Sequence, residues 1–257
     1  MLKKLIPVAL VGLLAGCAAY QEALSIKDSL QTFLVRSVTM KVGGSDQCKV
    51  ALIWGGTSAL TSLKRDGADV NVDKTKNFGQ DDVTPSGASY QYTATFENNK
   101  QVVRDIRPYT VGDAGEVDTV SPYALPFATT ARSGLKFRWH MKDAAKPNGF
   151  MVTVTDTAAP TVPIYNAFIE AASHSVDTDT YEIPYGTPSD MAVLTKEVLD
   201  LMAGMDSRFA KTDSGVSSDQ LDPNKTYAWI VSPLKIDDKA IRFCIGASSG
   251  SGFKVTQ

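Results

Sequence analysis

The chain has 257 residues, of which 43% are hydrophobic and 21% are charged, and its formal net charge at pH 7 is −2. This composition is typical of a globular protein with a sizeable core, and it excludes a disordered or collagen-like chain. The Lys and Arg residues form no block, which argues against a nucleic-acid partner, because such proteins cluster basic side chains to displace counterions.

The N-terminus reads as a secretory signal peptide over residues 1–16. Two lysines precede an apolar run at residues 5–14, and two small residues precede Cys17. A charged start, a short apolar stretch and a small-residue cleavage site are the three parts of such a signal. The apolar run has about ten residues, whereas a membrane-spanning helix needs about 20. We therefore expect residues 1–16 to be removed.

The cleavage site itself resembles the lipobox of bacterial lipoproteins, in the residues Leu14, Ala15, Gly16 and Cys17. The resemblance implies that the Cys17 thiol is diacylated, with chains such as palmitate, and that the new amino group can be acylated in turn. Two or three acyl chains hold a protein durably on a bilayer. Residue 18 is Ala, not the Asp that retains such lipoproteins in the inner membrane. The resemblance therefore favours the outer membrane, with the periplasmic or the surface-exposed side left open.

The mature chain, residues 17–257, is expected to be a single soluble α+β domain with a mainly antiparallel sheet. The first of two or three helices is expected at residues 19–37, next to the lipid anchor, because apolar residues recur there at helical spacing. Hairpin-like pairs of strands predict the sheet. A longer helix is expected at 189–205, and short helices are left open at 58–65 and 165–173. Strands are expected at 38–42, 49–54, 89–96, 102–106, 135–141, 150–155, 180–183, 226–231, 240–245 and 253–256.

The strand at 135–141 has the clearest pattern in the chain. Leu135, Phe137, Trp139 and Met141 alternate with polar residues, so period two places them on one sheet face. We expect residues 150–155 to be its antiparallel mate. The connections at 66–88 and 107–134 are read as long loops and as candidate functional surfaces. A subdivision of the domain is left open in the connections 107–134 and 157–188.

Cys48 and Cys244 are the two cysteines that follow the anchor. An oxidising compartment makes a disulfide the expected state of such a pair, and this bridge would join the first strand region to nearly the last. In the chain-entropy model a loop of this length stabilises the fold by roughly 5 kcal/mol.

Gly246 to Gly250 fit the pattern Gly-x-Ser-x-Gly, which in hydrolases marks a nucleophile elbow. Here only seven residues follow Gly250, and none of them is His or an acid. The elbow needs both later in the chain, so we interpret the motif as a flexible turn into the last strand. His140 and His174 are read as solvent-facing residues. Oxygen ligands at Asp66, Asp69, Asn71 and Asp73 leave an irregular calcium site open, although the EF-hand pattern fails.

No cofactor, metal or catalytic residue is predicted, and the favoured function is a non-enzymatic envelope lipoprotein. It would act as a binding, scaffolding or assembly subunit, with the membrane as one partner through its lipid and an envelope protein as another. Two alternatives stay open. One is a hydrolase of envelope glycan or peptide that uses paired carboxylates. The other is a surface adhesin or a carrier of small ligands.

Overall fold

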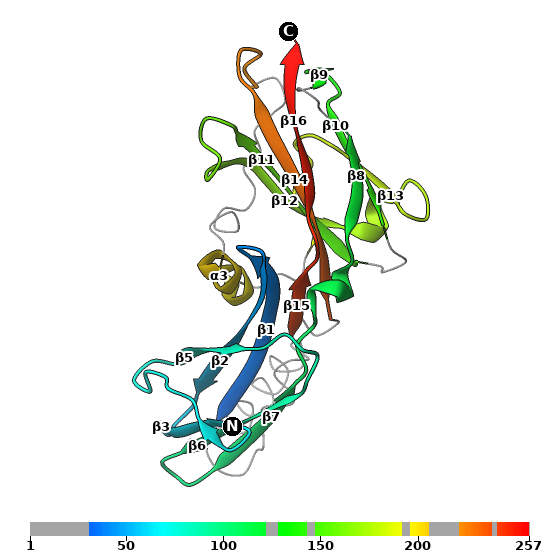
Figure 1. Cartoon of the computed structure of the whole chain (residues 1–257). Helices are drawn as coiled ribbons and strands as arrows, with labels where there is room; N and C mark the ends of the chain where they lie inside the picture. Colours follow the sequence, from blue (N-terminus) through cyan, green and yellow to red (C-terminus); the bar gives the residue numbers. More distant parts are fainter. Residues whose placement is uncertain are drawn as a thin grey trace, which may run out of the picture. The chain divides into compact units, whose positions relative to one another are not determined.

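The computed structural model describes residues 31–121, 128–142, 147–191, 196–205, 221–237 and 241–256 (Figure 1). Within these ranges the chain forms strands β1 to β16, two short 3-10 helices and one α-helix, α3 (Lys196–Met205). The predicted α+β class with two or three helices is therefore wrong, because the described chain is mainly β. No helix in the described ranges is both long and apolar enough to cross a membrane.

The described chain divides into two compact units. The first contains residues 31–36, 50–81 and 89–106, and the second contains 37–49, 82–88 and the described residues from 107 onward. One boundary, after Ile106, lies where the connection 107–134 begins. The prediction of one domain stays a prediction.

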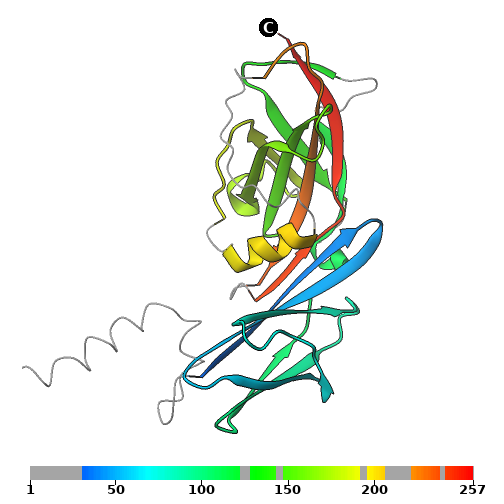
Figure 2. The ribbon, with the colours of Figure 1, turned by 90° about the vertical axis from the view of Figure 1, so that its left-hand side faces the viewer.

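The second unit contains two sheets. In the larger sheet the strands follow the order β12-β11-β14-β15-β1-β2-β5, and β16 pairs with both β14 and β9. Figures 1 and 2 show β14 and β16 side by side, in orange and red. The bounds are β1 (Thr32–Val42), β2 (Ser45–Gly55), β9 (Ala128–Ala131), β11 (Gly149–Asp156), β12 (Pro163–Glu170), β14 (Tyr227–Ile236), β15 (Arg242–Ile245) and β16 (Ser249–Thr256).

The other sheet has three antiparallel strands, in which β10 (Lys136–Met141) lies between β8 (Val117–Ser121) and β13 (Thr180–Pro184). The predicted alternation along β10 is confirmed, since Phe137, Trp139 and Met141 are buried. The predicted pairing of this strand with residues 150–155 is wrong, because β11 belongs to the opposite sheet.

Aromatic side chains fill the space between these two sheets. The ring of Phe137 lies 4.6 Å from that of Trp229 on β14 and 5.8 Å from that of Phe253 on β16. The ring of Trp139 lies 5.0 Å from that of Phe150 on β11. Each fully buried aromatic side chain contributes about 1.5–3 kcal/mol by leaving water. The second unit is therefore a β-sandwich, in which aromatic side chains of β10 pack against the inner face of the opposite sheet.

The first unit contains a four-stranded antiparallel sheet in the order β4-β3-β6-β7. Its core includes Phe33 and Leu52, from the portions of β1 and β2 in this unit, together with Tyr92 and Phe96. The N–H of Arg104 Nε donates to the carbonyl oxygen of Phe33 at 3.1 Å. The bounds are β3 (Leu60–Arg65), β4 (Ala68–Asp69), β5 (Phe78–Val83), β6 (Tyr90–Phe96) and β7 (Gln101–Ile106).

Three segments where a helix is expected or left open form strands instead. In the segment 19–37, residues 19–30 lie outside the described part, and residues 32–37 belong to β1, where burial alternates from Thr32 to Ser37. The segment 58–65 forms β3. The segment 165–173 forms most of β12 and the 3-10 helix η2 (Ala171–Ser173). Nearly every residue of β12 is buried, and an unbroken apolar run has no period that separates a helix from a buried strand.

Of the helix predicted at 189–205, the described part contains α3, and residues 192–195 lie outside it. The Ser189 hydroxyl accepts the N–H of Phe168 at 3.0 Å, and the Asp190 carboxylate accepts the N–H of Glu170 at 2.6 Å. The N–H of Asp190 donates to the carbonyl of Phe168. These bonds pair backbone groups at the outer edge of β12. Unpaired backbone groups at the edge of a sheet invite aggregation.

The predicted disulfide is not formed, since Cys48 and Cys244 are both free and buried. Cys48 lies on β2 and Cys244 on β15, and β1 runs between these strands. Neighbouring strands are about 4.8 Å apart, so the two cysteines are separated by roughly 10 Å, beyond the limit of about 7 Å for bridged Cα atoms. Burial raises the pKa of Cys48 to about 11 and that of Cys244 to about 12. Both thiols are therefore protonated and unreactive at neutral pH.

Alkylation with iodoacetamide tests this state of the two cysteines. In denaturant without reductant, peptide mass spectrometry should find both Cys48 and Cys244 alkylated, because neither sulfur is oxidised. Before unfolding, both should stay unlabelled for as long as the fold protects them. Labelling that appears only after reduction would show that the natural protein carries the bridge.

Candidate functional site

The motif from Gly246 to Gly250 is not the turn that the sequence predicts. β15 and β16 both pair antiparallel with β14, with Ile245 opposite Leu234 and Ser249 opposite Val231, so the motif continues in the strand direction, its last two residues begin β16, and its glycines pack against backbone. A Cβ atom at position 246 would lie 2.1 Å from the carbonyl oxygen of Gly115, and one at position 250 would lie 2.4 Å from that of Trp229. The N–H of Ala247 donates to Gly115 O at 3.0 Å. The two glycines are therefore required for close approach of chain segments, which is a structural role.

The serine of this motif contacts another serine. The hydroxyl oxygens of Ser248 and Ser232 are 2.7 Å apart, and either can donate. They line a hollow of about 380 Å³ with Met40, Lys41, Ile245, Gly246 and Ala247. We call this the serine hollow. Its lining contains neither His nor a carboxylate, so it provides neither the base of a serine hydrolase nor the paired carboxylates of a glycosidase.

A second hollow, of about 370 Å³, lies on the outer face of the three-stranded sheet. We call it the Arg138 hollow, and its lining comprises Thr119, Val120, Ser121, Arg138, Trp139, His140 and Thr180. The strand register sets its polar side chains in two rows. Ser121 lies opposite Arg138, while Thr119 and Thr180 lie on either side of His140. Because strands hold these side chains, their spacing is fixed more firmly than on a loop.

The other histidine, His174, contacts an acid. Its Nε2 lies 2.8 Å from an Asp190 carboxylate oxygen, and the hydroxyl of the adjacent Ser173 donates to Glu170. The serine and histidine thus bind different carboxylates. This arrangement supports the loop after β12 rather than a Ser-His-Asp triad.

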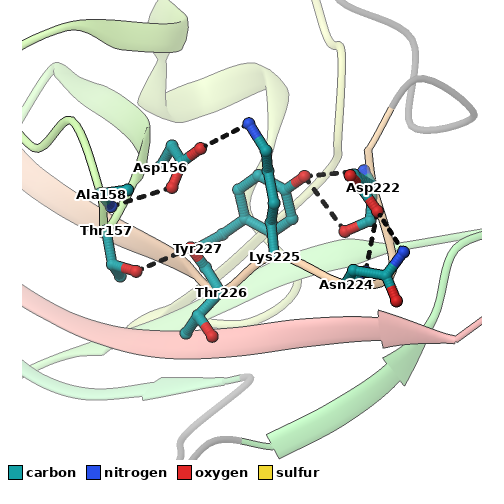
Figure 3. Close-up of polar contacts among 8 residues, drawn as sticks. All are labelled: Asp156, Thr157, Ala158, Asp222, Asn224, Lys225, Thr226 and Tyr227. Atoms are coloured by element: carbon teal, nitrogen blue, oxygen red, sulfur yellow. Dashed lines mark hydrogen bonds and ion pairs between the residues drawn. The ribbon is translucent and has the colours of Figure 1, made fainter.

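A polar network, drawn in Figure 3, fastens the hairpin between β11 and β12 to the start of β14. Lys225 Nζ lies 2.8 Å from one Asp156 carboxylate oxygen, and the other oxygen accepts the N–H of Ala158. These two bonds, that from Lys225 first, lower the pKa of Asp156. The Thr157 hydroxyl donates to the carbonyl of Thr226. The charged side chains of Asp156 and Lys225 are thus paired with each other inside the network.

The second half of the network is centred on Tyr227 (Figure 3). Its hydroxyl oxygen accepts the N–H of Asp222 at 2.7 Å, and the hydroxyl donates to the Asp222 carbonyl at 3.3 Å. The Asp222 carboxylate accepts the backbone N–H of Asn224. These bonds close a tight turn before β14, so the network stabilises the hairpin base.

A partly buried charge cluster lies in the first unit. A carboxylate oxygen of Asp81 on β5 lies 2.6 Å from Arg65 on β3 and accepts the hydroxyl of Tyr92 on β6 at 2.8 Å. Burial, and then the Asp81 carboxylate, raise the pKa of Tyr92. One carboxylate thereby joins three strands.

In the polar loop that was a candidate calcium site, two of the carboxylates accept hydrogen bonds from protein groups. Asp66 accepts the N–H of Gln91 at 2.8 Å, and Asp73 accepts both the N–H and the hydroxyl of Thr75. The described residues contain no group of three His, Cys, Asp or Glu residues able to hold a metal ion. Part of this connection forms β4 and β5, although the sequence pattern predicts a loop there.

The predicted lipid-attachment residue, Cys17, lies outside the described residues. The Arg138 hollow was missed because Ser121 falls in a connection read as irregular, where β8 forms. The alternation along residues 135–141 already placed Arg138 and His140 on one outward face, and this was the available signal.

No protein-family model and no curated protein matches the chain. Among solved structures, it is similar to the fibronectin(III)-like modules of Clostridium thermocellum CbhA, with 10% sequence identity and a TM-score of 0.36. The match covers 88% of this chain and 94% of that chain. Likeness at this level carries no argument about what the chain does.

Replacement of Gly246 tests the structural role of the motif. Gly246→Ala should lower the free energy of unfolding by about 1–3 kcal/mol, because the added methyl group must displace the backbone at Gly115. Urea unfolding followed by tryptophan fluorescence measures the loss. The matched control is Gly204→Ala on α3, where nothing lies within 4 Å of the new methyl group. An equal response from the two variants would contradict the packing argument.

Removal of Asp81 tests the charge cluster. Asp81→Ala should destabilise the fold by about 1–3 kcal/mol, because the buried Tyr92 hydroxyl loses its acceptor. The control is Asp82→Ala, whose side chain is 80% exposed and contacts Lys49. Exposed ion pairs contribute about 0–1 kcal/mol, so this second loss should be clearly smaller. Equal losses of unfolding free energy for the two variants would show that the cluster stabilises the fold no more than an exposed ion pair does.

Proposed function

We propose that the chain is a lipid-anchored lipoprotein of the bacterial envelope and that its folded part is a non-enzymatic binding, scaffolding or assembly subunit. The observation that carries the proposal is the signal sequence ending in Leu14, Ala15, Gly16 and Cys17. Acylation at Cys17 would tether the body of the protein to a membrane outside the cytoplasm. The absence of Asp after Cys17 favours the outer membrane.

The β structure supports a binding or scaffolding role. Glycines of the Gly-x-Ser-x-Gly motif serve close packing, and the networks around Asp156 and Asp81 join strands to one another. The hydrolase alternative requires two carboxylates facing one another across a cleft. Neither the serine hollow nor the Arg138 hollow has a carboxylate in its lining. The carrier alternative fits these hollows better, because each has a volume suited to a small ligand.

Replacement of Cys17 tests the anchor. In cells, the Cys17→Ala chain should move from the membrane fraction to the soluble fraction or stay unprocessed, because no thiol is present to receive lipid. Cys48→Ala is the control, since it removes a cysteine that lies outside the lipobox. Recovery of both variants in the membrane fraction would contradict anchoring through Cys17.

Crosslinking tests the role as a subunit. Mild crosslinking of the acylated wild-type protein in intact cells, followed by solubilisation and affinity capture, should yield one envelope protein in stoichiometric amount. Recovery of the chain alone under conditions that crosslink a known envelope complex would count against a scaffolding or assembly role.

A further inference from the structure

The outer face of β8, β10 and β13 presents polar groups whose hydrogen-bonding capacity is unused. Within the described part of the chain, the Arg138 guanidinium and the His140 imidazole make no hydrogen bond. The same holds for the hydroxyls of Thr119 and Ser121. All four side chains line the Arg138 hollow. The hollow thus gathers one permanent cation, one imidazole ring and two hydroxyls that make no hydrogen bond within the described part of the chain.

Two acidic residues near this hollow are engaged by other groups. Glu182, which lies opposite Arg138 on β13, binds Lys136 at 2.7 Å. The Asp177 carboxylate accepts the backbone N–H groups of Asp179 at 3.1 Å and Thr180 at 2.9 Å. A hydrogen bond from the Thr180 side chain is the first cause of a lowered pKa of Asp177, and attraction by Arg138 contributes least. Arg138 therefore retains capacity for a stronger, directly bonded anion.

The sheet is irregular at this place. The pairing of β10 with β8 shifts register between His140 and Met141, because Thr119 pairs with His140 while Val117 pairs with Met141. Such bulges bend a strand and redirect side chains, and they are common beside binding sites. The bulge lies at the His140 end of the hollow. The volume of about 370 Å³ is near the lower end of ligand pockets, which suits a single ring-sized group.

We propose that the Arg138 hollow binds a carboxylate-bearing saccharide unit. The guanidinium fork matches the two oxygens of a carboxylate, and such charge-assisted pairs are stronger than neutral hydrogen bonds. His140 and the hydroxyls of Thr119 and Ser121 then bind the sugar hydroxyls. This inference rests on the proposed function, which it deepens by naming the ligand class.

Ligand-observed NMR titration of the full acylated protein in neutral detergent micelles tests the proposal. The probe is D-glucuronate, with D-glucose and acetate as single-feature controls. Glucuronate should bind more tightly than either control, because only it supplies both the carboxylate and the ring hydroxyls. Affinity for glucuronate no greater than for glucose would overturn the carboxylate assignment. Affinity no greater than for acetate would overturn the saccharide assignment, and no detectable binding would overturn both.

Two variants locate the site. Arg138→Gln should weaken glucuronate binding about tenfold or more, because hydrogen bonds to charged groups contribute about 1.5–3 kcal/mol. Arg138→Lys should recover only part of the loss, since it keeps the charge without the fork. The matched control is Lys254→Gln on β16, an exposed cation outside the lining. Equal weakening by Arg138→Gln and Lys254→Gln would overturn the assignment to this hollow.

The outcomes separate this inference from the proposed function. A Cys17→Ala chain that leaves the membrane but binds glucuronate normally would support the site independently of the anchor. A membrane-bound Arg138→Gln chain that crosslinks its partner normally and loses only glucuronate would do the same. Retention of folded structure is checked for each variant by circular dichroism.

Discussion

The side chains of Phe137 and Trp139 extend from β10 into the space between the two sheets of the second unit, where they meet Trp229, Phe253 and Phe150. A sheet that is apolar on one face must bury that face against another layer, and this contact supplies the layer against which the three-stranded sheet packs. The same alternation that turns these rings inward turns Arg138 and His140 outward. The core and the Arg138 hollow are therefore two faces of one strand.

This coupling explains which parts of the fold the sequence predicts. Residues 135–141 alternate strictly, so their strand and its two faces were predicted correctly. The strands expected at 38–42 and 49–54 lie within β1 and β2, and Gly43 and Gly44 between them have positive φ. By contrast, β12 is buried along nearly its whole length, and β5 carries charged and polar residues. Neither has an amphipathic period, so local pattern could not assign them.

The errors at the candidate sites have a related cause, because each depended on which strands become neighbours. Cys48 and Cys244 lie in strand-like segments, but the sequence does not show that β1 separates them. Ser121 joins Arg138 only because β8 pairs with β10. Gly246 was read as part of a turn, whereas it continues the strand direction from β15 into β16 and closely contacts Gly115. Long-range pairing determines all three, and local periodicity carries no information about it.

In the proposed account, a lipid at Cys17 holds a strand-rich body at the envelope, and a fixed sheet face provides its binding groups. The most direct test is the intact mass of the natural protein extracted from membranes. The account predicts a chain that begins at Cys17 and carries the added mass of two or three acyl chains. A chain that begins at Met1, or one whose Cys17 thiol is unmodified, would contradict it.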